Sequence, residues 1–102
     1  MPGIDFAAVR ASISLLDVLK LLNFSPTRYR GDRLRGRCPF GCGSSPRDFA
    51  AYLDTNSYYC FCCHHGGNQL ELWADLQRLS LYDAAKDLCH RLNIPVPLIY
   101  RW

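Results

Sequence analysis

Six cysteines in a chain of 102 residues are the side chains of this sequence best suited to chemistry. Four of them form two close pairs, in which three residues separate Cys38 from Cys42 and two separate Cys60 from Cys63. Such pairs suit the two knuckles of a tetrahedral Zn²⁺ site, where each thiolate lies ~2.3 Å from the metal. A disulfide framework is the alternative. We expect zinc, because the N-terminus shows no secretory signal and thiols stay reduced in the cytosol, the expected compartment.

The four paired cysteines predict one closed, structural Zn²⁺ site, since four thiolates leave no coordination position open for water. His64 and His65 directly follow the second pair, so either can replace Cys42 and give a site of three cysteines and one histidine. Cys62 lies inside the second pair and is expected to point away from the metal. Cys89 falls in a helical segment and is expected to be a small apolar core residue.

Helices are predicted before the cysteines, within residues 4–23. The pattern indicates a short helical piece, Ile4–Arg10, and a second helix rich in leucine. Ser14 and Asp17 have the spacing of a capping box at the start of this second helix, and Asn23 is a plausible end.

Two further helices are predicted after the cysteines. Gly66 and Gly67 are expected to break the chain there. Asn68 and Ser80 each stand three residues before an acidic residue, which predicts that each is the N-cap of a helix. The second of these helices is expected to end near Asn93.

Extended segments lie between the two helical regions. Residues 27–37 alternate with period two around Gly31-Asp32 and predict a hairpin. Strands are also predicted at Phe49–Leu53 and Ser57–Cys60. The sum is a small α+β domain, in which an antiparallel sheet with two zinc knuckles is flanked by N- and C-terminal helices. We expect residues 1–94 to form this single domain and residues 95–102 to form an apolar tail containing two prolines.

The hairpin concentrates the positive charge of the chain. The expected cross-strand pairs are Arg28 with Arg35, Tyr29 with Leu34, and Arg30 with Arg33. One face then carries five arginines: Arg28, Arg30, Arg33, Arg35 and Arg37. With one aspartate, the hairpin window has a charge of +4, whereas the whole chain has +3. Like charges facing each other destabilise a hairpin. The cluster therefore indicates a binding surface, with a solvated face as the alternative.

Nucleic acid is the expected partner of this surface, because the planar guanidinium group suits phosphate and stacks on bases. Basic surfaces with aromatic platforms are typical of proteins that bind single strands. Tyr29 and Tyr58 are the candidate platforms. Packing is the expected role of Phe40, Phe49 and Phe61.

Four stretches of the sequence resemble the CHC-type zinc-finger domain at the N-terminus of bacterial replicative primases. They are Cys38-Pro-Phe, Ser45-Pro-Arg-Asp-Phe49, Tyr58-Tyr-Cys-Phe-x-Cys63 and Gly66-Gly-Asn68. The resemblance covers roughly residues 10–93. It implies a zinc ribbon with one structural Zn²⁺, and it places Cys38, Cys60 and Cys63 at three of the family's ligand positions. The family has histidine where this chain has Gly41, so Cys42 is the natural substitute.

The resemblance also implies a function. The family's domain engages single-stranded template DNA and helps primase choose its start site, so we expect a DNA-binding module that serves replication or a mobile element. Catalysis in the family resides in a separate polymerase domain with metal-binding carboxylates. No comparable constellation is evident here, so we expect no enzymatic activity.

Residues 95–102 suggest an alternative function, because this tail is apolar for a chain end. The tail either folds back over the helices or docks onto a protein partner such as a polymerase or recombinase. No apolar run reaches the ~18 residues that a membrane helix requires, so no membrane association is expected.

Overall fold

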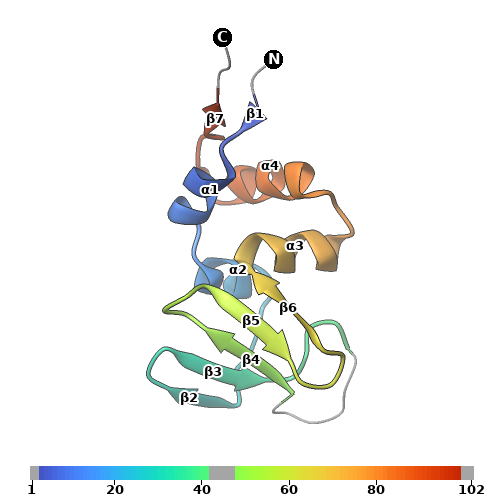
Figure 1. Ribbon diagram of the computed structural model, residues 1–102. Helices are drawn as coiled ribbons and strands as arrows, with labels where there is room; N and C mark the ends of the chain where they lie inside the picture. Colours follow the sequence, from blue (N-terminus) through green and yellow to red (C-terminus); the bar gives the residue numbers. More distant parts are fainter. Residues whose placement is uncertain (1–2, 42–47, 100–102) are drawn as a thin grey trace.

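The structure, a computed structural model, describes residues 3–41 and 48–99. Its main sheet is an antiparallel meander in the order β2-β3-β4-β5-β6, each strand pairing with the next along the chain. These strands are Arg28–Arg30, Arg33–Gly36, Phe49–Tyr52, Ser57–Cys60 and His65–Asn68. The helices lie on one side of the sheet (Figure 1): α1 Phe6–Ser12, α2 Leu15–Leu21, α3 Gln69–Gln77 and α4 Leu81–Arg91. The predicted α+β class, with an antiparallel sheet flanked by helices, is confirmed.

Side-chain caps set where the N-terminal helices begin. The Asp5 carboxylate accepts a hydrogen bond of 3.1 Å from the first turn of α1. Ser14 Oγ accepts from the Asp17 backbone N–H, and the Asp17 carboxylate accepts from the Ser14 backbone N–H, each at 3.1 Å. This is the predicted capping box of α2. The prediction that helix begins at Ile4 is wrong, because the cap at Asp5 leaves Ile4 in strand β1 (Gly3–Ile4).

Strand β6 contradicts the prediction that two glycines break the chain after the cysteines. Gly66 pairs with Tyr59, and a Cβ at this position would lie 2.9 Å from the Tyr59 ring. A Cβ at Gly67 would lie 3.1 Å from the carboxyl group of Glu71. The glycines therefore let the chain pass close to an aromatic ring and enter α3 directly. Asn68 is the N-cap of α3, as predicted, and forms a capping box with Glu71.

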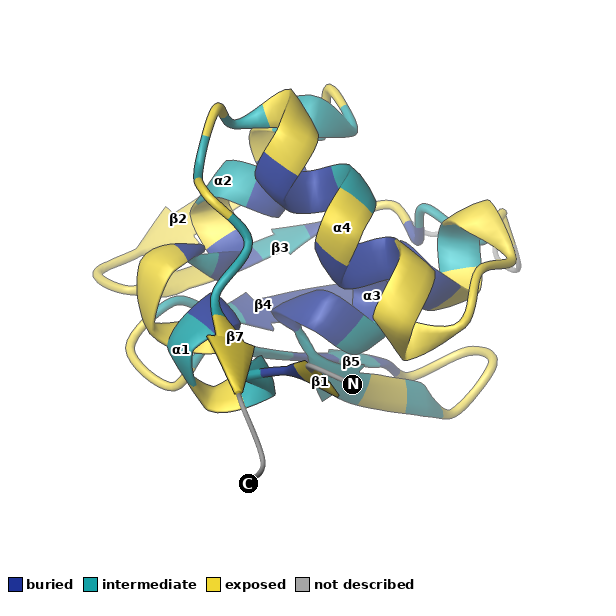
Figure 2. Ribbon diagram, turned by 90° about the horizontal axis from the view of Figure 1, so that it is seen from above, coloured by how far each residue is buried: buried dark blue, intermediate teal, exposed yellow. Residues whose placement is uncertain are grey.

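The inner face of the sheet, which faces the helices, forms the main core. Its residues Leu34, Phe49 and Tyr58 are between 0% and 5% exposed. Figure 2 shows buried stripes along α3 and α4; α3 packs on this layer, and α4 packs on α3. The buried Gln69 joins α3 to the end of α1, because its Nε2 donates hydrogen bonds of 3.0 and 2.8 Å to backbone carbonyls there. Packing thus holds the sheet against the helices, and polar links also join the helices to one another.

The C-terminal segment returns to the beginning of the chain. Strand β7 (Leu98–Ile99) pairs antiparallel with β1, with Gly3 opposite Ile99. Ile94 and Val96 pack against the core. Residues 95–99 therefore fold back onto the domain, as one of the two alternatives predicts. The last three residues of the predicted docking tail lie outside the described part. In the part of the chain that is described, no helix has the length and apolar character needed to cross a bilayer.

Candidate metal centre and nucleic-acid interface

Three thiols gather at the end of the sheet. Cys38 follows β3, Cys60 is the last residue of β5, and Cys63 lies in the turn that leads to β6. Their sulfur atoms all lie within 4.8 Å of one another. Tetrahedral Zn–S bonds of ~2.3 Å separate sulfurs by ~3.8 Å, so small side-chain adjustments suit this group to one ion. Gly41, with φ of +71°, closes the first knuckle by donating its N–H to the Cys38 carbonyl at 3.0 Å.

The two histidines beside the second knuckle do not join this thiol cluster. Nδ1 of His64 lies 3.0 Å from the Tyr59 hydroxyl oxygen, and Nε2 of His65 lies 2.7 Å from a carboxylate oxygen of Asp75. Cys62 is exposed and also stays outside the cluster. Cys42 lies outside the described residues, so its role as fourth ligand remains a prediction.

The Tyr58 ring lies on the inner face of the sheet, close to the thiol cluster. It is 2% exposed and stacks against Phe49, with ring centroids 5.6 Å apart, and against Phe40, at 6.3 Å. Burial raises the pKa of its hydroxyl group, which has no hydrogen-bond partner in the described structure. The prediction that Tyr58 is a platform for bases is therefore wrong, because its ring is enclosed by other aromatic rings.

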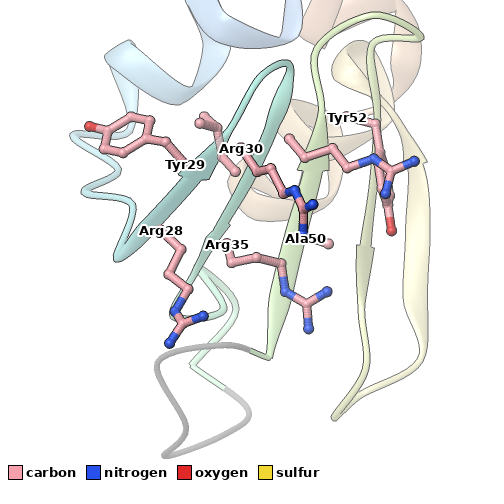
Figure 3. A pocket seen from close by; sticks show the side chains of 8 residues that line it. Arg28, Tyr29, Arg30, Arg35, Ala50 and Tyr52 are labelled. Atoms are coloured by element: carbon pink, nitrogen blue, oxygen red, sulfur yellow. The ribbon is translucent and has the colours of Figure 1, made fainter.

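Four arginines gather on the outer face of the hairpin, and we call them the arginine face: Arg28, Arg30, Arg33 and Arg35. The predicted register is confirmed, with Arg28 opposite Arg35 and Arg30 opposite Arg33. They line a groove of about 290 Å³ that extends over Tyr52 of β4 (Figure 3). Across residues 3–41 and 48–99, no carboxylate lies within 4.0 Å of these guanidinium groups. Unpaired like charges around a groove attract anions.

Aromatic side chains continue this surface across the outer face of β4 and β5, and we call Tyr52, Tyr59 and Phe61 the outer aromatics. The Arg33 guanidinium carbon lies 5.9 Å from the Tyr52 ring centroid, and that of Arg35 lies 4.8 Å from the Phe61 centroid. Tyr59 meets Phe61 edge to face at 5.1 Å. Cations above aromatic rings hold both groups in place, so the outer face combines ordered positive charge with flat apolar surface.

The sequence contained a signal for these aromatics that was missed. Side chains alternate between the faces of a strand. Cys60 must point inward to reach the other thiols, so Tyr59 and Phe61 must point outward. Phe61 is indeed 48% exposed, and the prediction that it packs in the core is wrong. The same prediction holds for Phe49, which is 0% exposed, and for Phe40, which packs against the core.

Two predicted contact residues do not extend the arginine face. Arg37 follows β3 and lines a separate groove of about 420 Å³ beside Cys38. Tyr29 also lines the groove of the arginine face, but its side chain leaves β2 on the opposite side, as its pairing with Leu34 requires. Its ring points away from the side on which the labelled guanidinium groups lie (Figure 3). The basic surface is therefore smaller than the sequence predicts.

Comparison with known proteins identifies the family. A family model described as the CHC2 zinc finger matches residues 4–100. The DNA primase of Treponema pallidum is 30% identical over 95 residues, a match covering 92% of this chain and 16% of the primase. The DNA primase of Staphylococcus epidermidis is 30% identical over 96 residues, covering 93% of this chain and 16% of the primase. The chain therefore spans only a small part of the length of these relatives.

A solved structure supports the fold. The crystal structure of the zinc binding and RNA polymerase domains of Aquifex aeolicus primase matches 92% of this chain and 23% of that one, with a TM-score of 0.76 and 23% identity. Clustered thiols are a donor set that suits zinc. The chain therefore belongs to the CHC2 zinc finger family, as a small zinc-binding domain of the kind found in DNA primases, and its thiol cluster holds a structural zinc ion.

Proposed function

We propose that this module binds single-stranded DNA through the arginine face and outer aromatics, and that it serves replication or the replication machinery of a mobile element. The observation that carries the proposal is the set of four facing arginines with no carboxylate within 4.0 Å in the described structure. Repulsion across two cross-strand pairs costs stability. A phosphate backbone would remove that cost, and exposed rings beside the guanidinium groups suit unpaired bases.

Zinc has a structural role in this proposal. Cys38 follows the strand that bears Arg33 and Arg35, while Cys60 and Cys63 end and follow β5. When bound, the ion ties these points together through thiolate bonds. The arginine face is thereby held rigid, so that little entropy is lost when its side chains meet phosphates. We propose Cys42 as the fourth ligand, because both neighbouring histidines have other partners.

We propose that the chain binds DNA without synthesising primers. The primases that it matches are much longer, since the matches cover 16% of their length. The measurement is primer synthesis by the purified chain with Mg²⁺, nucleotides and a single-stranded template. We expect no product, and primers made by the chain alone would contradict this part of the proposal.

The binding test compares two double variants that remove the same charge from different surfaces. The variant Arg33→Gln/Arg35→Gln removes the charge of two of the four residues of the arginine face. The control Arg10→Gln/Lys86→Gln removes two exposed positive charges from helices α1 and α4. Titrations use a single-stranded oligonucleotide, the matching duplex and the RNA equivalent, each at several salt concentrations.

Each lost phosphate contact lowers the slope of log affinity against log salt by ~0.7 for a single strand. We therefore expect the arginine-face variant to bind single-stranded DNA more weakly, with a slope smaller by about 1.4. The control should keep the wild-type slope and most of the affinity. Equal effects of both variants would mean that overall charge, rather than the arginine face, governs binding. Tighter binding of the duplex or of RNA would contradict the preference for single-stranded DNA.

A further inference from the structure

A third groove lies on the opposite side of the hairpin from the arginine face, between β2 and helix α2. Its volume is about 360 Å³, and its walls include Leu16, Pro26, Tyr29 and Leu53. The rim is open, because Tyr29 is 73% exposed and Leu16 is 38% exposed. Both faces of the edge strand β2 therefore border a groove, one basic and one apolar.

The charges around this apolar groove favour an anionic ligand. Among the described residues that line this groove, Lys20 of α2 is the charged one, and none carries a carboxylate. An exposed tyrosine ring, apolar walls and one lysine form a set that suits a base stacked on an aromatic face, with a phosphate at the rim. An aromatic ring left 73% exposed beside such a groove is also available for stacking from solvent.

We propose that this groove binds a base of the same single strand whose phosphates lie on the arginine face. The proposal rests on the function proposed above. Strand β2 is the edge of the sheet, and all three of its residues are exposed. A single strand can bend around one β-strand and place a base against Tyr29. A duplex cannot follow this path, because its persistence length is about 50 nm. The groove thus contributes to the preference for single strands.

The test replaces Tyr29 and compares it with another exposed tyrosine. Tyr29→Ala should lower the affinity for a single-stranded oligothymidylate about tenfold, within the range measured for loss of one stacked base. Its salt slope should stay unchanged, since no phosphate contact is removed. Tyr29→Phe should retain binding. Tyr82, 47% exposed on α4, supplies the control Tyr82→Ala, which should bind as the wild type does.

A direct measurement locates the base. An oligonucleotide carrying 5-iodouracil at successive positions is crosslinked by light, and the modified residue is identified by mass spectrometry. We expect Tyr29 among the crosslinked residues at one position of the oligonucleotide. Crosslinks confined to Tyr52, Tyr59 and Phe61, with wild-type affinity of Tyr29→Ala, would overturn the proposal and leave the groove for a protein partner.

The two proposals fail in different ways. If the wild-type chain bound no single-stranded DNA, or bound it equally well without Arg33 and Arg35, the proposed function itself would fail. If binding depended on those arginines and on salt but not on Tyr29, only the groove proposal would fail. The high exposure of Tyr29 means that its replacement should leave the thermal unfolding midpoint within a few degrees of the wild type.

Discussion

The two faces of the five-stranded sheet consist of alternate residues of the same strands, yet their chemistry is opposite. On the inner face, Leu34 and Phe49 are at most 5% exposed and pack beneath the helices. On the outer face, Arg33 and Arg35 flank Leu34 in sequence and meet no carboxylate within 4.0 Å among the described residues. The period-two alternation of a strand thus separates the buried core residues from the arginines and outer aromatics that are proposed to bind DNA. Each face can therefore be altered with little effect on the other.

The helices and the sheet also differ in whether their charged side chains form ion pairs. Asp87 of α4 accepts hydrogen bonds from the indole of Trp73 at 2.8 Å and from Arg91 at 3.0 Å. The Arg91 guanidinium also lies 5.2 Å from the Trp73 ring centroid. This ion pair of the helical layer thus stabilises the fold, whereas the guanidinium groups of the arginine face have no carboxylate partner among the described residues.

Removing zinc should have the largest effect. It tests whether the packing of the inner face is sufficient for folding without the metal. A bound structural zinc ion contributes on the order of 10 kcal/mol to small domains. We expect a strong chelator, or Cys60→Ser, to unfold the sheet and abolish DNA binding. Circular dichroism with metal analysis measures this. A metal-free chain that kept the native spectrum and melting midpoint would show that packing alone holds both faces in place.

The next largest effect compares the first and last residues of β4, which lie on opposite faces of the sheet. Phe49 is fully buried, with ring centroids 5.3 Å from Phe24 and 5.6 Å from Tyr58. Phe49→Ala should lower the free energy of unfolding by about 3–5 kcal/mol. Tyr52→Ala, on the outer face, should cost about 1 kcal/mol or less. Urea denaturation of both variants measures the difference, and similar losses would mean that the outer face also stabilises the fold.

A smaller effect is expected from the paired carboxylate of the helical layer. Burial opposes ionisation of Asp87, but hydrogen bonds from Arg91 and Trp73 outweigh it and lower the pKa of Asp87 below its usual value. A lowered pKa stabilises the fold above the unfolded-state value of about 3.9, and the gain is lost as pH falls through the folded-state pKa. Asp87→Asn should therefore cost about 1 kcal/mol at pH 7. Melting midpoints of the two proteins should converge below pH 4, and a constant difference would contradict this account.

The smallest change in stability should have the opposite sign. Arg30 faces Arg33 directly, so Arg30→Glu replaces a repulsive pair by an attractive one. We expect it to stabilise the fold by about 0.5 kcal/mol while it weakens binding of single-stranded DNA. Thermal unfolding and a binding titration on the same preparation test both signs. A variant that lost stability and kept affinity would show that the arginine face belongs to the fold rather than to the interface.

Local signals in the sequence were strong enough to predict several features. The turn at Gly31-Asp32 fixes the hairpin register, since Gly31 adopts a positive φ of 61°. Ser14 and Asn68 have side chains that cap helices at short range, and both helices begin as predicted. The thiol spacing likewise predicted the cluster of three sulfurs. All of these depend on residues a few positions apart, or on one chemical requirement that is visible in the sequence.

Other features depend on contacts that sequence spacing does not show. Strand β6 contains Gly66 and Gly67, which have low strand propensity. It forms by pairing with β5, and a side chain at either position would crowd the Tyr59 ring or Glu71. The opposite orientations of Tyr58 and Tyr59 follow from the inward direction of Cys60, a constraint set by the distant Cys38. Phe61 points outward for the same reason, but the position of Arg35 over its ring has no local signal in the sequence. Long-range packing decided each of these outcomes.

The pairing of β1 with β7 has a practical consequence. Gly3 and Ile99 lie side by side beyond α1 and α4, at the end of the molecule opposite the five-stranded sheet (Figure 1). A short peptide could join them, and the chain could then be reopened in the exposed turn between β4 and β5. Such a circular permutant would carry any fused fluorophore next to the arginine face, whereas fusion near Gly3 or Ile99 would keep the label away from it. The same domain could therefore be used either as a proximity reporter or as an unobstructed binder.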